Sequence, residues 1–385
     1  MGYDDLIKFI RDLYGIPEGD IPLHAPVLKG KEKEYLLNCI DTGYVSSVGA
    51  FVERFERMVG SRIGAADAVA VVNGTSALHV ALRAVGVDRG DLVITQALSF
   101  VATANAVMYC GAEPVFLDVE QGSMGLDPAA LALFLEQATY INNGRCCHIQ
   151  SGKRIAACVP MHTFGHPCAI ERIVEICTAY DIPVVEDAAE ALGSEMVGAS
   201  GHRSCGLFGR AGIFSFNGNK IVTSGGGGMV VTTDEALGAK IRHLTTTAKK
   251  PHPYLYEHTE LGYNYRMPNI NAAVGCAQFE RLDDFLTQKR ELANRYHDFF
   301  KGSSIHPVCE PVGTRSNYWL NTIITADRKE RDALIEATNQ AGIYTRPVWT
   351  PLNRLPMYEH AVTDSLERTT YFADRLVNLP SSVKA

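Results

Sequence analysis

Short apolar runs of strand length alternate with segments of helical spacing between residues 68 and 187, and this alternation constrains the fold more than any other feature. The first run, AVAVV, is followed by NGT and by SALHVALRAVGV, and the pattern repeats along the chain. Strands that are apolar throughout are typical of parallel sheets covered by helices on both faces, and right-handed crossovers connect them. The sequence predicts an α/β protein with a mainly parallel central sheet. The predicted strands lie at residues 68–72, 92–95, 114–119, 154–162 and 183–187.

The length of 385 residues fits two or three domains. We expect an N-terminal arm over residues 1–30, a large domain over 31–262 and a smaller C-terminal α+β domain over 263–385. The pattern that starts at NINAAVG predicts one helix of about nine turns bridging the domains. Further predictions are a strand at 318–325, a helix near 365–377 and a polar surface loop at 144–154.

Charge and cysteine usage exclude several classes of function. The net charge of −7 provides no positive field for nucleic acid or an anionic membrane. No apolar run approaches the length of a membrane span, and the N-terminal segment carries acids where a signal peptide needs basic residues. We therefore expect a cytoplasmic protein with reduced cysteines. Cys146, Cys147 and His148 lack the spacing of metal ligands, and we predict no metal.

A phosphate site is predicted at NGTSAL, where Gly74 and Thr75 lie between a strand and a helix. Free N–H groups and the helix dipole favour an anion at such a helix start. A plain turn with an N-cap residue is the alternative interpretation. The absence of GxxxxGK[ST] and GxGxxG motifs argues against a nucleoside triphosphatase and a dinucleotide-binding fold.

Two further segments place reactive groups at the carboxyl edge of the sheet. Asp187 ends a predicted strand, where it can hold a cationic ring nitrogen, and Glu190 follows three residues later. Lys220 lies in a glycine-flanked loop five residues after Ser215, and a desolvated lysine there can form a Schiff base with a carbonyl. A helix N-cap for Asp187 and a solvated loop charge for Lys220 are the alternatives.

Three other positions are candidates for ligand contacts. Phe100 starts a helix after a strand and offers an aromatic face to a planar ligand, with core packing as the alternative. Asn264 precedes the long helix and suits an anion or a subunit contact. His162 begins the HTFGHP segment at a predicted sheet edge, where substrate contact or turn chemistry fits better than metal binding.

The ordered set NGTSAL, SFVATANA, EDAAEALGS, FSFNGNKIVTSGGGG and GYNYRMPNINAAVG resembles the DegT/StrS family of pyridoxal-phosphate sugar aminotransferases over nearly the whole chain. The resemblance implies an aspartate-aminotransferase-like fold (fold type I) and a homodimer with a shared active site. It also implies pyridoxal 5'-phosphate as cofactor, with pyridoxamine phosphate as its intermediate form.

The same resemblance implies a role for each motif residue. Lys220 is similar to the lysine that bonds covalently to the cofactor, and Asp187 to the partner of the pyridine nitrogen. Glu190 stands where other members have His or Gln near the ring hydroxyl. Phe100 corresponds to the residue that stacks on the ring, and Asn264 to one that reaches the phosphate from the neighbouring subunit. The phosphate-binding positions correspond to Gly74, Thr75 and Ser215.

The N-terminal segment, HTFGHP and TRPVWTPLNRLPMY look most like the legionaminic acid and bacillosamine subgroup. This implies transfer of an amino group from L-glutamate to C4 of a UDP- or GDP-linked 4-keto-6-deoxy acetamido hexose. Candidate substrate contacts are Ser46, Ser47, His162 and Tyr318. The alternatives are a pyridoxamine-dependent sugar dehydratase, disfavoured because Lys220 is present, and a non-catalytic ligand-sensing regulator, disfavoured because the motifs are intact.

Overall fold

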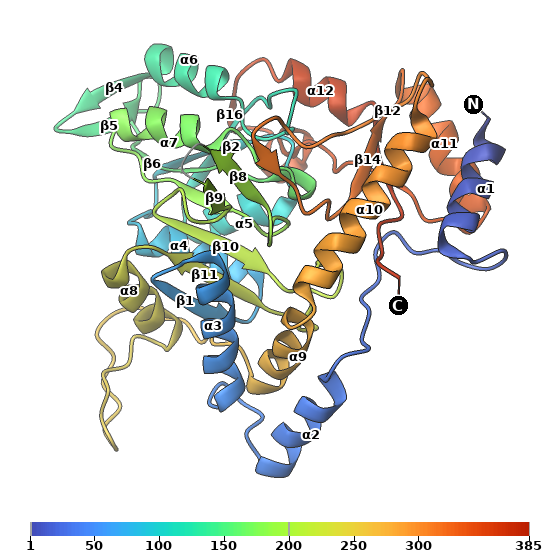
Figure 1. The fold of residues 1–385 in the computed structure, drawn as a ribbon. Coiled ribbons are helices and arrows are strands. Elements are labelled where there is room, and N and C mark those ends of the chain that lie inside the picture. Colours follow the sequence, from blue (N-terminus) through green and yellow to red (C-terminus); the bar gives the residue numbers. More distant parts are fainter. Residues whose placement is uncertain (1, 199–200, 385) are drawn as a thin grey trace.

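The computed structural model describes residues 2–198 and 201–384 and shows a twisted central sheet with helices on both faces (Figure 1). The β6 and β7 halves of this sheet are joined by the parallel bridges Cys158–Val184 and Met161–Asp187. All neighbouring pairs are parallel except those made by β11, which runs antiparallel to β1 and β10. The predicted α/β fold with a mainly parallel sheet is therefore confirmed. The strand order is β1 (Asp67–Val71), β11 (Gly228–Thr232), β10 (Ala211–Ser215), β7 (Val185–Asp187), β6 (Ile155–Val159), β2 (Leu92–Gln96), β3 (Glu113–Leu117) and β16 (Val362–Thr363).

The apolar strands bury both faces of the sheet against separate helices. One face packs on α4, α5 and α8, and the other packs on α6 and α7. A three-layer arrangement follows, in which each strand side chain meets a helix rather than water. These helices are α4 (Gly74–Ala84), α5 (Val101–Tyr109), α6 (Pro128–Ala138), α7 (Ile170–Ala179) and α8 (Glu235–Thr245).

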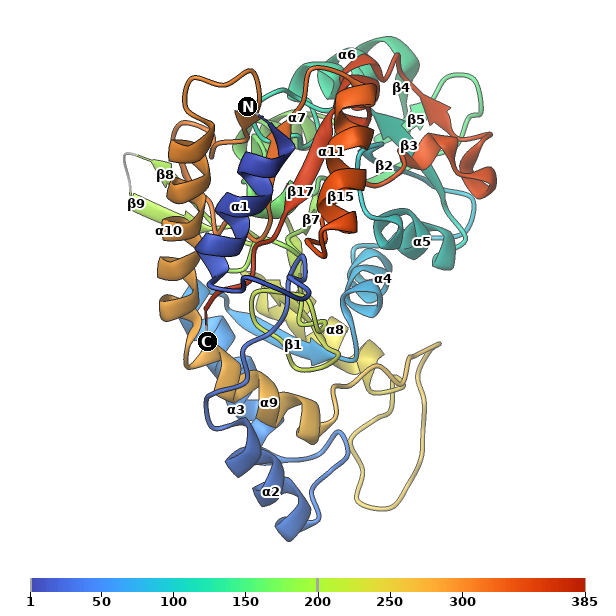
Figure 2. The same cartoon turned by 90° about the vertical axis from the view of Figure 1, so that its right-hand side faces the viewer.

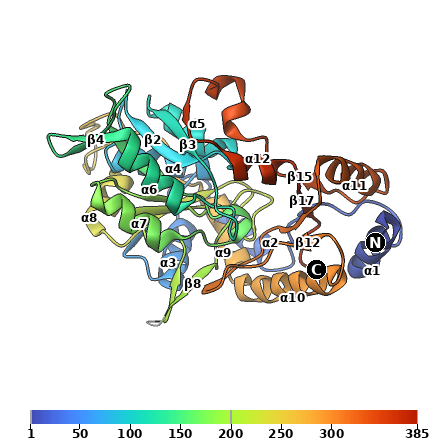
Figure 3. The same ribbon diagram turned by 90° about the horizontal axis from the view of Figure 1, so that it is seen from above.

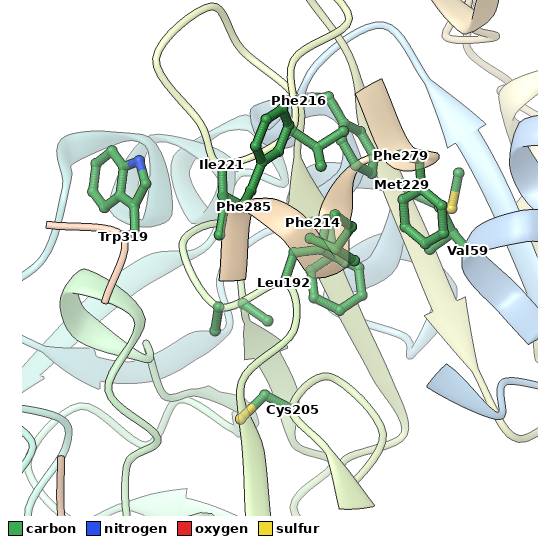
Figure 4. Close-up of a cluster of buried hydrophobic side chains, with 14 of the residues drawn as sticks. Val59, Leu192, Cys205, Phe214, Phe216, Ile221, Met229, Phe279, Phe285 and Trp319 are labelled. Carbon is green, nitrogen blue, oxygen red and sulfur yellow. The ribbon is translucent and has the colours of Figure 1, made fainter. Parts of the chain in front are cut away.

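The largest core cluster lies between the β1–β10 half of the sheet and helices from both ends of the chain. Phe214, Phe216 and Met229 come from the sheet and its following loop, and Phe279 and Phe285 pack on them (Figure 4). Because α9 contacts α2 and α3 here, it belongs with the large domain. The helices are α2 (Glu32–Thr42), α3 (Ala50–Ile63) and α9 (Asn269–Phe279).

A smaller domain stands beside the large one, with α1, α10 and α11 at its surface (Figures 1 and 3). Its sheet has the antiparallel order β12-β14-β17-β15. The first helix of the chain packs there through Leu6, Ile10 and Leu13, which join the same core cluster as Tyr296 and Leu334 (Figure 2). The N-terminal segment is thus an integral layer of this domain. Its elements are α1 (Tyr3–Tyr14), α10 (Leu282–Phe300), β12 (His306–Pro307), β14 (Asn321–Ile324), α11 (Arg328–Gln340), β15 (Arg346–Pro347) and β17 (Leu376–Leu379).

Three local predictions were wrong. The segment predicted as a loop at 144–154 forms β5 (Arg145–His148), which pairs with β4 (Thr139–Asn142) and buries Cys146 and Cys147. The long helix is broken at Glu280 and Arg281, because α9 packs on the large domain and α10 on the smaller one. The last helix, α12 (Glu367–Ala373), stops early, and the chain continues as strand β17.

The remaining elements connect the two domains or border the site. A three-stranded sheet in the order β13-β8-β9 joins a segment of the smaller domain to the large one. Among helices within residues 2–198 and 201–384, none is both long enough and apolar enough to cross a membrane. These elements are β8 (Glu195–Gly198), β9 (Gly201–Ser204), β13 (Thr314–Arg315) and the 3₁₀ turns Thr163–Gly165, Leu352–Arg354 and Pro356–Tyr358.

Candidate functional site

A cavity of about 310 Å³ lies at the carboxyl ends of β7 and β10, where open α/β sheets bind ligands. The starts of α4 and α5 and the loop after β10 form its large-domain walls, and two tryptophans, Trp319 and Trp349, close it from the other side. Seven residues singled out in the sequence meet here although they come from four separate motifs. They are Gly74, Thr75, Phe100, Asp187, Glu190, Ser215 and Lys220.

One end of the cavity is a helix N-terminus suited to an anion. Asn73 caps α4, its side-chain oxygen accepting the Ser76 N–H at 2.8 Å. A Cβ on Gly74 would lie 3.0 Å from Cβ of Ser215, so glycine is what lets the two segments approach this closely. The first N–H groups of α4 lack partners within the helix and point toward the ligand space together with the positive end of the helix dipole.

A buried carboxylate lies at the other end. Asp187 accepts hydrogen bonds from Thr103 Oγ1 at 2.7 Å and from the Ala189 N–H at 3.2 Å. Burial raises the pKa of Asp187, while these donors and the positive field of Lys220 lower it. A cation bound to this carboxylate would offset the cost of burying its charge.

Lys220 lies between an acid and an aromatic ring. Its Nζ is 3.2 Å from Glu190 Oε1 and 3.9 Å from the centre of the Trp319 ring. The other oxygen of Glu190 accepts the Phe164 N–H at 2.9 Å. Burial raises the pKa of Glu190 to about 7, an effect that the nearby Lys220 opposes. At neutral pH this pair therefore holds an exchangeable proton inside the cavity.

Aromatic side chains line the mouth. Phe100 is the N-cap residue of α5 and keeps 48% of its surface exposed. Its ring centre lies 6.1 Å from that of Trp349, which in turn lies 5.0 Å from that of Phe164. An exposed ring at a cavity mouth provides a flat apolar surface for a planar ligand.

The predicted substrate contacts do not line this cavity. His162 is fully buried, with Nε2 3.1 Å from Glu186 Oε2 and Nδ1 accepting the Cys168 N–H at 3.1 Å. Tyr318 is buried, and its hydroxyl accepts the Glu310 N–H at 3.1 Å. These positions do not support direct substrate contact for either side chain, because both are occupied by protein groups.

Three predicted residues lie on the surface away from the cavity. Ser46 and Ser47 are in the loop between α2 and α3, where the Ser46 carbonyl accepts the Asn269 N–H at 2.6 Å. Asn264 is exposed and forms a backbone bridge with Thr246. A role for Asn264 across a subunit boundary stays a prediction.

Sequence reasoning missed the residues that support the motifs. Thr103 lies within SFVATANA, but only the fold shows that its hydroxyl meets Asp187. Trp319 and Trp349 reach the site from outside the large-domain sheet. One signal was present, because these are the two tryptophans of the whole chain and large aromatic residues are enriched at binding sites.

A second, larger hollow of about 550 Å³ lies at the amino ends of the strands. Its arginines are paired, Arg154 with Asp91 and Arg210 with Asp234, at 2.6 and 2.7 Å. None of the motif residues lines it. The chemistry therefore points to the smaller cavity at the carboxyl edge.

Comparison with known proteins agrees with this site. The DegT/DnrJ/EryC1/StrS aminotransferase family matches residues 26–385. The chain is 37% identical over 350 residues to the putative pyridoxal phosphate-dependent aminotransferase EpsN of Bacillus subtilis (strain 168), covering 91% of this chain and 86% of that protein. It is 37% identical over 366 residues to the GDP-perosamine synthase of Escherichia coli O157:H7, covering 94% and 93% of the two chains.

Solved structures show the same fold. The aminotransferase TlmJ from Streptoalloteichus hindustanus superposes with a TM-score of 0.84 at 28% identity, covering 94% of each chain. The family predicted from the five motifs is confirmed, whereas the finer legionaminic acid and bacillosamine subgroup stays a prediction. The chain belongs to the DegT/DnrJ/EryC1/StrS aminotransferase family.

Proposed function

We propose that this aminotransferase uses pyridoxal 5'-phosphate to move an amino group from L-glutamate to C4 of a nucleotide-linked 4-keto-6-deoxy hexose, an acetamido sugar in the form we favour. The observation that carries the proposal is the meeting of Lys220, Asp187 and the α4 N-terminus in one cavity. These groups match the aldehyde, the ring nitrogen and the phosphate of this cofactor.

The chain supplies a holder for each part of the cofactor. Gly74, Thr75 and Ser215 would bind the phosphate, Asp187 the protonated ring nitrogen, and Phe100 one face of the ring. When bound, pyridoxal phosphate supplies an aldehyde that accepts amino groups and a ring that withdraws electrons from the substrate carbon. The buried Asp187 suits this pairing because a cation offsets the cost of its buried charge.

Proton transfer falls to Lys220. Among the lining residues that the structure describes, it carries the basic amine, and a neutral lysine amine can take and return a proton at the substrate carbon. Glu190, at 3.2 Å, accepts a hydrogen bond from this Nζ and limits where the amine can lie. Trp319 borders it on the other side and helps to exclude water.

The acceptor is inferred from the relatives. The curated proteins of Escherichia coli O157:H7 and Caulobacter vibrioides are named GDP-perosamine synthase, at 37% and 36% identity. Their names support a nucleotide-linked sugar as the acceptor class, with UDP and GDP both to be tested. We further propose a cytoplasmic homodimer in which Asn264 of one subunit reaches the phosphate of the other.

The test is incubation of the purified protein with glutamate, followed by separate UDP- and GDP-linked 4-keto-6-deoxy sugars. Cofactor absorbance reports each half-reaction, and product mass reports the new amine. We expect glutamate to change the absorbance and one ketosugar to restore it with formation of an amino sugar. Loss of a sugar hydroxyl without amine gain would identify a dehydratase, and no cofactor absorbance would refute the proposal.

A further inference from the structure

A second cavity adjoins the site and is not used by any motif residue except through shared walls. Its volume is about 400 Å³, and it shares Asn219, Trp319 and Trp349 with the cofactor cavity. A ligand that reacts beside Lys220 can therefore extend past the tryptophans into this space. The other lining residues are Pro22, Leu23, His24, Leu320, Tyr344, Arg346, Pro347 and Asn378.

His24 presents an unpaired imidazole to this cavity. Both ring nitrogens are inaccessible to water and have no hydrogen-bond partner within the described residues. Burial, Lys289 and Lys220 all lower the pKa of His24 well below its usual value, so the ring is neutral and offers one donor and one acceptor. Unpartnered buried polar groups are costly, and a ligand that bonds to this ring removes that cost.

The charges around the cavity favour an anion. Arg346 lies on the short strand β15 and is exposed, and no acidic side chain lines the cavity. The carboxylate of nearby Asp20 accepts the Tyr344 hydroxyl at 2.9 Å. The buried Lys289 donates to the Trp319 carbonyl at 2.8 Å and to the Ser381 carbonyl, which adds a cation close behind the wall.

We propose that this second cavity binds an anionic oxygen group of a substrate, with Arg346 as its cation and His24 as its hydrogen-bond partner. The inference rests on the proposed function, because the bound molecule must present its reacting atom to Lys220. Two substrate parts share this chemistry: a carboxylate of the amino donor and the diphosphate of the nucleotide sugar. Arginine binds either group through paired N–H donors.

The two tryptophans make the cavity directly observable. Trp319 and Trp349 are the only tryptophans in the sequence, and both stand in the shared wall. Intrinsic fluorescence of the cofactor-loaded protein can therefore be titrated with three unreactive probes: glutarate, UDP and GDP. We expect at least one probe to bind the wild type and to bind Arg346→Ala and His24→Ala about tenfold or more weakly, as for loss of a charge-assisted hydrogen bond.

Matched variants separate a local from a general effect. Arg328→Ala removes an exposed arginine from α11 in the same domain and should leave every affinity unchanged. Arg346→Lys should keep part of the affinity, since it retains the charge but loses the paired donors. His24→Gln provides a second test of the imidazole position if His24→Ala does not fold.

The outcomes decide both the inference and its source. Weakened glutarate binding assigns the cavity to the amino donor, and weakened UDP or GDP binding assigns it to the nucleotide sugar. Unchanged affinities in Arg346→Ala and in the folded His24 variant, or no binding of any probe to the wild type, overturn the inference. Because the titration needs no turnover, a wild type that fails to transfer amino groups refutes the proposed function separately.

Discussion

Replacing Thr103 with valine tests the idea that Asp187 must be charged to hold the cofactor. Valine keeps the shape of threonine but removes the hydroxyl that donates to Asp187 at 2.7 Å. A hydrogen bond to a charged group contributes about 1.5–3 kcal/mol. Because burial already raises the pKa of Asp187, its charged form depends on such donors. We expect Thr103→Val to bind pyridoxal phosphate about 10- to 150-fold more weakly at pH 7.

The assay is equilibrium dialysis of the cofactor-free protein against pyridoxal phosphate at two pH values. The loss should be smaller at pH 8.5, since higher pH restores the charge on Asp187 that the missing donor no longer stabilises. Thr103→Ser retains a hydroxyl and should bind nearly normally. Thr95→Val is the matched control, because Thr95 is equally buried but donates to the Val159 carbonyl. An affinity of Thr103→Val within about twofold of the wild type would refute the reasoning.

Three further predictions concern the catalytic amine, the acid beside it and the phosphate cradle. Lys220→Ala should form no borohydride-trappable bond to pyridoxal phosphate and should transfer amino groups at least about 10³-fold more slowly; a trapped bond in this variant would disprove the assignment. Folding raises the pKa of Glu190 from 4.5 to about 7, so the wild type should lose up to about 3 kcal/mol relative to Glu190→Gln as pH rises through that window. Urea midpoints of the two cofactor-free proteins at pH 5 and pH 8 measure this, and an unchanged difference would contradict it. A Cβ at Gly228 would collide with the Asn73 carbonyl, whereas one at Gly226 would lie 4.0 Å from its nearest neighbour; Gly228→Ala should therefore lower stability by about 1–3 kcal/mol and Gly226→Ala should not. Thermal melting with and without cofactor compares these two variants, and equal melting temperatures would contradict the assignment.

The central fold and the motif side of the site could be predicted because both follow from local order along the chain. A residue that ends a buried parallel strand must lie at the carboxyl edge, and this rule alone brings Asp187 and Ser215 to the same side of the sheet. The helix that starts after β1 adds Gly74 and Thr75 for the same reason.

The other half of the site depends on packing between distant segments. Trp319 meets Lys220 only because the smaller domain packs on the large one, and no local pattern encodes that contact. The break at Glu280 has neither glycine nor proline, since it arises where two helical faces pack on different domains. Residues 376–379 follow a helix without a turn signal, which explains why strand β17 was predicted as the end of that helix.

The packing of α1 on the smaller domain has a consequence for synthesis of the protein. Leu6, Ile10 and Leu13 find their partners in residues 292–379, so the apolar face of the first helix to leave the ribosome stays uncovered until the last strand is made. At about 5–20 residues per second this interval lasts roughly 15–60 s. We expect the nascent large domain to fold during that time while α1 is held by chaperones, and truncation of α1 to expose the core of the finished smaller domain.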